Sequence, residues 1–174
     1  MNTVHRIIRH AVEAIIVIIM LEALYVVQYH ITHCCNHYLS ETVPLVELVD
    51  ARGYLVTYVT AEDMPIKDAQ GCIVYADKTI YLLEDSVQLI KYHEYGHAYS
   101  HIVPVPDELT DALLATQRWW VSGDYQLDNP DELIAQGVAC YLECEDYVDT
   151  VSRITGYPLN DMLKEYIGYA NQYL

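Results

Sequence analysis

The pattern of apolar and polar positions along the chain predicts a hydrophobic first segment, a group of short strands and several helices. Residues 11–27, AVEAIIVIIMLEALYVV, are apolar except for Glu13 and Glu22. Short runs rich in β-branched and aromatic residues predict strands, and runs with one apolar face predict helices. Strands are expected at 54–60, 72–76 and 79–83, and helices at 43–53, 86–101, 107–120, 129–156 and 158–174.

Residues suited to turns and helix ends mark the boundaries of these elements. The strands at 72–76 and 79–83 are so close in sequence that we expect a hairpin or two adjacent strands. Asp85 or Ser86 can cap the helix that follows them. Asn129 is a natural cap for the helix at 129–156, and Gly156 suits the position after its end.

The apolar first segment has two interpretations. Arg6 and Arg9 precede it, and its length and flanking charge are typical of a signal anchor. Glu22 opposes insertion by about 2.5–3.5 kcal/mol, so a helix buried inside a soluble fold is the alternative. No small-x-small cleavage site follows, which disfavours a cleaved signal peptide. We therefore divide the chain into residues 1–40, a hydrophobic helix that is either buried or a membrane anchor, and residues 41–174, one domain.

The charge balance excludes one class of partner. The chain has 25 acidic and 9 basic residues, and its formal net charge is −16. No cluster of Lys and Arg offers a local exception to this acidic surface, which repels phosphate backbones. Nucleic acid is therefore not an expected partner.

Cysteine and tyrosine usage adds two expectations. The 5 cysteines are an odd number without the spacing of a disulfide scaffold, which favours a reducing, intracellular compartment. Cys140 and Cys144, one helical turn apart, are expected to be core-facing thiols. The chain has 17 tyrosines and no phenylalanine. Tyrosine must therefore supply most of the aromatic core, and its buried hydroxyls need hydrogen-bond partners.

The segment KYHEYGHAYSH, residues 91–101, carries the strongest chemical signal. His93 and His97 lie four positions apart, so both imidazoles share one helical face and can reach one Zn²⁺ at about 2.0–2.1 Å. Glu94 follows the first histidine and can accept a proton from a water beside the metal. The segment thus matches the HExxH pattern of zinc peptidases.

A catalytic zinc usually has three protein ligands, so a third must come from elsewhere. His101 is on the same face but about 12 Å along the helix axis from His93, too far for one ion. Glu132, in the first turn of the 129–156 helix, is preferred, because a carboxylate is stabilised there and the two helices can cross. Other carboxylates compete for the role: Asp124, Asp128 and Asp131.

A second group of candidate metal ligands follows the apolar first segment: His30, His33, Cys34, Cys35 and His37. Histidine and cysteine are the usual zinc ligands. Adjacent cysteines on one helix, however, point about 100° apart. A polar helix end is therefore the preferred interpretation of residues 30–37.

Two parts of the chain resemble the gluzincin zinc peptidases, in particular the anthrax lethal factor-like group. Residues 43–101 are similar to the small gluzincin domain in their order of helix, strand, strand pair and HExxH helix. The segment YQLDNPDELIAQ resembles the stretch that carries the ligand Glu, with a Tyr seven residues before it, an Asn three before it and an Ala three after it. These positions are Tyr125, Asn129, Glu132 and Ala135. The resemblance covers residues 43–150.

The resemblance implies an α+β, zincin-like fold, in which a small mixed sheet packs on the HExxH helix and the Glu-bearing helix, with extra N- and C-terminal helices. It implies that one zinc ion is held by His93, His97 and Glu132. It further implies that Glu94 is the general base for a zinc-bound water and that Tyr125 donates to the developing oxyanion.

Gln136 departs from the family pattern, which often has a second acid one turn after the ligand Glu. An amide oxygen can still accept a hydrogen bond from a ligand imidazole, although less strongly than a carboxylate. The departure therefore predicts weaker zinc binding without excluding the chemistry.

Three functions remain open from the sequence. The first is a zinc endopeptidase acting on a peptide or protein, with 72–76 or 79–83 as the edge strand that aligns the substrate. The second is a zincin-fold regulatory or interaction protein with little turnover. In the third, His93 and His97 are surface histidines of a structural or membrane protein. Trp119 and Trp120 either line a specificity pocket or belong to the core.

Overall fold

The computed structural model describes residues 44–120 and 129–174, and these residues belong to one compact unit. The predictions for residues 1–40, including the membrane anchor at 11–27 and the ligand group at 30–37, lie outside the described residues. Within the described ranges, no helix has both the length and the apolar character needed to cross a membrane.

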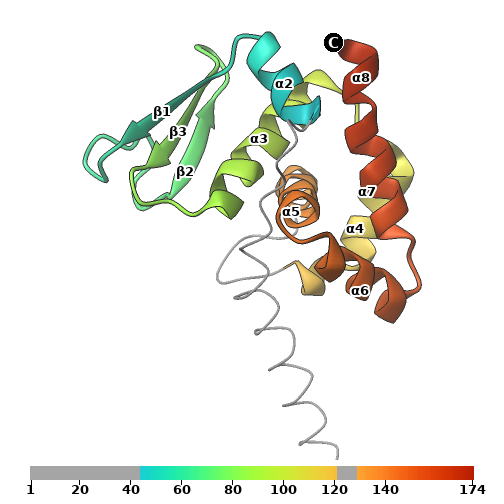
Figure 1. Ribbon diagram of the computed structural model, residues 1–174. Helices are drawn as coiled ribbons and strands as arrows, with labels where there is room; N and C mark the ends of the chain where they lie inside the picture. The colour runs from blue at the N-terminus through green and yellow to red at the C-terminus, as the bar shows by residue number, and fades with distance from the viewer. Residues whose placement is uncertain (1–43, 121–128) are drawn as a thin grey trace, which may run out of the picture. The chain divides into compact units, whose positions relative to one another are not determined.

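The strands form a three-stranded mixed sheet. They are β1 (Leu55–Val59), β2 (Gly71–Val74) and β3 (Thr79–Leu83), in the order β1-β3-β2. β1 runs parallel to β3, whereas β2 is antiparallel to β3, with Ile73 opposite Ile80. Ile80 and Leu82 of the central strand are buried, and the sheet lies on one side of helix α3 (Figure 1). The predicted small mixed sheet is confirmed, and β2 is an edge strand.

Helix α3 (Gln88–Ile102) carries the HExxH segment, as predicted. Seven consecutive residues, His93 to Tyr99, are buried, so this helix is covered on every side at its middle. The predicted cap was wrong. Val87 occupies the cap position, and its apolar side chain makes no cap hydrogen bond. The amide of Ser86 donates to Leu83 O at 3.0 Å in the turn before the helix.

The segment 129–156 forms two helices instead of the single helix predicted. α5 (Pro130–Glu143) and α6 (Glu145–Thr155) meet at Cys144, whose φ of −152° and ψ of 78° are not helical. Cys144 is disulfide-bonded, while Cys140 is a free thiol, so the expectation of two core thiols was wrong for Cys144. The predicted ends are confirmed: Asn129 Oδ1 accepts from Asp131 N at 3.1 Å, and Gly156 has a φ of 78°.

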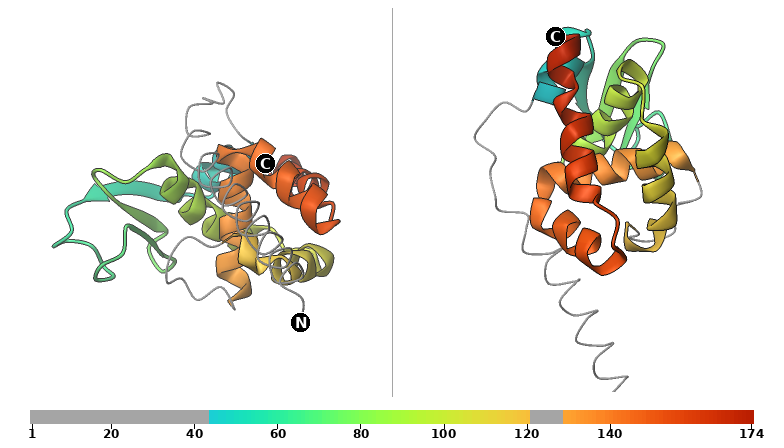
Figure 2. Two further views of the ribbon diagram at one scale, coloured as in Figure 1. Left: turned by 90° about the horizontal axis from the view of Figure 1, so that it is seen from below. Right: turned by 90° about the vertical axis from the view of Figure 1, so that its right-hand side faces the viewer.

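The remaining helices surround α3 and α5. They are α2 (Pro44–Ala51), α4 (Asp107–Ala115), the 3-10 turn η2 (Gln117–Trp119), α7 (Leu159–Gly168) and α8 (Ala170–Tyr173). The predicted helices at 107–120 and 158–174 are thus each interrupted. α2 and α8 lie side by side in Figures 1 and 2, and Arg52 Nη2 donates to Tyr173 O at 2.8 Å. The mixed sheet and these helices confirm the α+β class.

Buried tyrosine hydroxyls find partners, as the lack of phenylalanine predicted. Tyr99 donates to Tyr166 O at 2.6 Å, and Tyr166 in turn donates to Val103 O at 3.1 Å. Tyr95 donates to Asp50 Oδ1 at 3.0 Å, which ties α3 to the end of α2. These bonds let phenol rings fill a core without leaving buried donors unsatisfied.

Candidate metal centre

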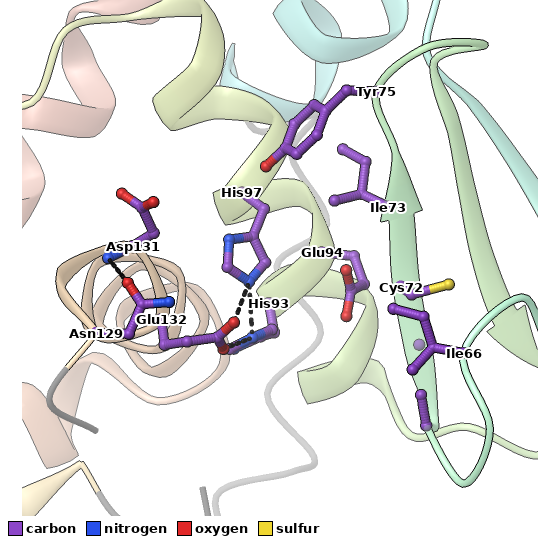
Figure 3. Close-up of a pocket in the computed structure, with 12 residues that line it drawn as sticks. Ile66, Cys72, Ile73, Tyr75, His93, Glu94, His97, Asn129, Asp131 and Glu132 are labelled. Atoms are coloured by element: carbon purple, nitrogen blue, oxygen red, sulfur yellow. Dashed lines mark hydrogen bonds and ion pairs between the residues drawn. The ribbon is translucent and has the colours of Figure 1, made fainter. Parts of the chain in front are cut away.

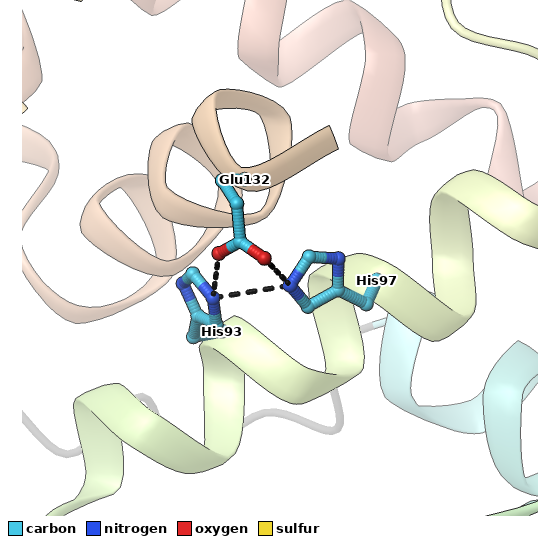
Figure 4. A group of neighbouring side chains, drawn as sticks. All are labelled: His93, His97 and Glu132. Carbon is cyan, nitrogen blue, oxygen red and sulfur yellow. Dashed lines mark hydrogen bonds and ion pairs between the residues drawn. The ribbon is translucent and has the colours of Figure 1, made fainter. Parts of the chain in front are cut away.

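A close crossing of α3 and α5 builds the site. Gly96 lies against Ala135: a Cβ at Gly96 would be 2.9 Å from Ala135 Cα and 3.0 Å from its carbonyl oxygen. Only glycine allows two backbones to approach this closely. The crossing brings the HExxH face of α3 against the first turns of α5, so that Glu132 faces both histidines (Figure 4).

Three side chains converge at this crossing. His93 Nε2 lies 3.1 Å from His97 Nε2 and 3.1 Å from Glu132 Oε2, and His97 Nε2 lies 3.5 Å from Glu132 Oε1. Ligands at about 2.0–2.1 Å from a tetrahedral zinc ion are about 3.3–3.4 Å apart. The observed spacings fall close to this value, so His93, His97 and Glu132 could hold one metal ion.

The hydrogen bonds that Gln136 makes behind His93 fit the same chemistry. Gln136 Oε1 lies 3.2 Å from His93 Nδ1, and Gln136 Nε2 donates to Cys140 Sγ at 3.3 Å. The amide oxygen can only accept, so Nδ1 of His93 donates to it. With Nδ1 protonated, neutral His93 has its lone pair on Nε2, the atom that a metal ion would bind. A lone pair placed there suits a cation, and Gln136 occupies the orienting position that the sequence predicted for it.

Burial and neighbouring groups shift the pKa values of Glu94 and Glu132 in opposite directions. His93, His97 and Glu94 are 8%, 9% and 6% exposed, so neither histidine is the surface residue that one sequence interpretation required. The two imidazoles beside Glu132 hold its pKa well below the usual range. Burial raises the pKa of Glu94 to about 7, and the charge of Glu132 adds to that rise while His93 opposes it.

A cleft of about 350 Å³ opens beside the three ligand candidates (Figure 3). One wall is formed by β2 and the loop before it, and the other by the start of α5, with α3 between them. Glu94 lines the cleft next to β2, where a Cβ at Gly71 would lie 3.0 Å from Glu94 Oε1. The volume is within the range of ligand-binding clefts, about 300–1,000 Å³.

The structure leaves other sequence candidates outside the group of three. His101 is exposed at the end of α3 and takes no part in it, as predicted. Asp131 lines the cleft but is also outside the group. Trp120 is buried, donating from Nε1 to Thr116 Oγ1 at 3.0 Å, and neither tryptophan lines the cleft. Three further candidates lie outside the described residues: Asp124, Tyr125 and Asp128.

Four residues of the site had not been singled out from the sequence: Ile66, Ala69, Gly71 and Gly96. Tyr75 lies in the segment 72–76, which had been proposed as an aligning strand, but it had no role of its own. Gly71 and Tyr75 line the cleft, at the beginning of β2 and just after its end. Gly96 sets the helix crossing. Only Gly96 had a local signal, because a glycine in the middle of a helix is unfavourable unless packing requires it.

Comparison with known proteins yields no relative: no family model matches the chain, and no curated protein or solved structure matches it. The likeness to gluzincins therefore rests on the two sequence motifs.

Proposed function

We propose that the protein is a zinc-dependent endopeptidase of the gluzincin type with a zincin-like fold. His93, His97 and Glu132 are the ligands in this proposal. The observation that carries it is the convergence of these three side chains at one end of a cleft that Glu94 also lines. A bound zinc ion would polarise a peptide carbonyl and lower the pKa of water, which are its usual contributions to hydrolysis.

Glu94 is the general base and acid in this proposal. Its carboxylate lies at the cleft wall beside Gly71 and is almost fully buried. There it can accept a proton from the attacking water and return it to the leaving amine, which is what a positioned carboxylate contributes to such a reaction. The predicted role of Tyr125 as the oxyanion donor stays part of the proposal, although its position is not described.

The proposed substrate is a peptide or an extended protein segment. β3 is the central strand and is paired on both sides, which excludes residues 79–83 as the aligning edge. β2 is an edge strand, and Gly71, Cys72 and Ile73 of it line the cleft. An extended peptide can add to such an edge through main-chain hydrogen bonds. We therefore assign substrate alignment to β2.

The test combines metal content with turnover of a library of internally quenched random peptides. We expect about one zinc per folded chain, and we expect Glu94→Gln to retain this zinc while losing about 10²–10⁴-fold in turnover, the usual contribution of a general base. Glu47→Gln is the matched control, since Glu47 is an exposed acid in the first turn of α2.

Two results would contradict the proposal. Less than about half an equivalent of zinc in protein shown to be folded would remove the metal from it. One equivalent of zinc in protein that cleaves no peptide of the library would favour the regulatory or interaction protein with little turnover.

A further inference from the structure

Tyr75 lies just past the end of β2 and lines the cleft. In Figure 3 its hydroxyl points away from the strand, toward the space between His97 and Asp131. Its side chain is 44% exposed, so the phenol borders both the cleft and solvent. It thus reaches over the cleft at the end nearer His97, while Glu94 lies beside the opposite end of β2.

The ring of Tyr75 packs against the ring of His101. The two ring centroids are 4.7 Å apart, with an interplanar angle of 36°. His101 belongs to the last turn of α3, one turn after the ligand candidate His97. The third histidine of the HExxH helix therefore contacts a residue of the cleft wall, and this contact favours the orientation in which the phenol borders the cleft.

The hydroxyl of Tyr75 differs from the buried tyrosine hydroxyls, because it has no hydrogen-bond partner among residues 44–120 and 129–174. Tyr95, Tyr99 and Tyr166 each donate a hydrogen bond to another residue. Tyr75 donates to none of the residues in the described part of the chain. Burial raises the pKa of Tyr75 to about 12, and the negative charges of Asp131, Glu94 and Glu132 add to that rise. The phenol therefore keeps its proton and is a donor at neutral pH.

We propose that Tyr75 is a substrate-positioning residue, which donates a hydrogen bond from its hydroxyl to a carbonyl oxygen of the peptide held in the cleft. A carbonyl is the expected acceptor because every peptide offers one at each residue. The ring contact with His101 restricts this donor before the peptide binds, so less freedom is lost on binding. This inference rests on the proposed peptidase function and adds a substrate contact to it.

The test measures binding to the zinc-loaded protein by calorimetry. Three probes are used: acetohydroxamate, which reaches only the metal, and two hydroxamates that carry three alanines on one side or the other of the metal-binding group. Tyr75→Phe removes only the hydroxyl. We expect it to weaken at least one trialanine probe about five- to tenfold, the usual worth of one hydrogen bond, and to leave acetohydroxamate unchanged.

Matched variants separate positioning from general damage. Tyr157→Phe makes the same chemical change at a tyrosine of similar exposure, 41%, and should change no probe. His101→Ala should weaken the same trialanine probe as Tyr75→Phe, and His101→Phe, which keeps a ring for stacking, should restore it. With the best-cleaved library peptide, Tyr75→Phe should raise KM more than it lowers kcat.

Equal affinity of wild type and Tyr75→Phe for both trialanine probes would overturn the inference while leaving the peptidase proposal intact. Failure of acetohydroxamate to bind the zinc-loaded wild type would instead overturn the peptidase proposal, and the inference with it. The small probe therefore distinguishes the two failures.

Discussion

Replacing Gly96 by alanine tests whether the helix crossing positions the metal ligands. The added Cβ would lie 2.9 Å from Ala135 Cα, whereas carbon atoms in contact prefer about 3.5–4.0 Å. α3 and α5 must therefore separate by roughly 0.6–1 Å. The atoms that it meets belong to backbone, so no rotation of a side chain can relieve the contact.

The magnitude follows from two opposing effects. Overpacking usually costs about 1–3 kcal/mol, and a backbone obstacle places Gly96→Ala near the upper end. The better helix propensity of alanine opposes this by stabilising the helix by about 0.8–1.0 kcal/mol. We therefore expect the free energy of unfolding to fall by about 1–2 kcal/mol. Zinc–ligand distances tolerate about 0.2 Å, so the separation should also weaken zinc binding at least about tenfold.

Gly168→Ala is the matched control, because Gly168 is also helical and a Cβ there would meet nothing within 4 Å. It should be neutral or stabilising by up to about 1 kcal/mol. Urea denaturation of the metal-free proteins measures the first effect, and competition with a chromogenic chelator measures the second. If Gly96→Ala matches Gly168→Ala in stability and binds zinc as tightly as wild type, the helix crossing does not position the metal ligands.

Two further predictions concern the metal ligands. Gln136→Leu removes the acceptor of the His93 Nδ1 hydrogen bond and should weaken zinc binding by about 10–100-fold. Gln136→Glu should instead strengthen it. Chelator competition measures both affinities, and values equal to that of wild type would contradict the orienting role of Gln136. Zinc at a free concentration 100 times its Kd should stabilise the fold by about 2.7 kcal/mol, visible as a higher Tm than in EDTA. His97→Ala should abolish that rise while His101→Ala keeps it, and the opposite pattern would exclude His97 as a ligand.

Local sequence rules were sufficient where one short segment determines the structure. The β-branched runs predicted three strands, and the spacing of His93 and His97 predicted one shared helical face. The cap at Asn129 fixed where α5 begins, and hence that Glu132 lies in its first turn. A spacing rule of this kind needs only the helical period, which is why these parts of the candidate site could be anticipated.

Long-range contacts explain what the sequence did not reveal. The pattern of residues 129–156 is helical throughout, yet Cys144 interrupts it with a non-helical backbone and is disulfide-bonded. The stacking of Tyr75 on His101 joins residues 26 positions apart, and no periodicity relates a strand end to a helix end. Gly96 could be recognised as unusual, but its partner Ala135 becomes known only once α3 and α5 cross.

The residues between the two histidines show why packing and chemistry cannot be separated in this helix. Tyr95 donates to Asp50 of α2, and Gly96 lies against the backbone of α5. Glu94 faces Gly71 of β2 in a third direction. α3 is thus held by a helix end, a helix crossing and a sheet edge within one turn, and it can neither rotate nor slide without breaking one of these contacts. The spacing of His93, His97 and Glu132 is therefore set by the core of the protein, which is the pre-organisation that a metal site or a general base requires.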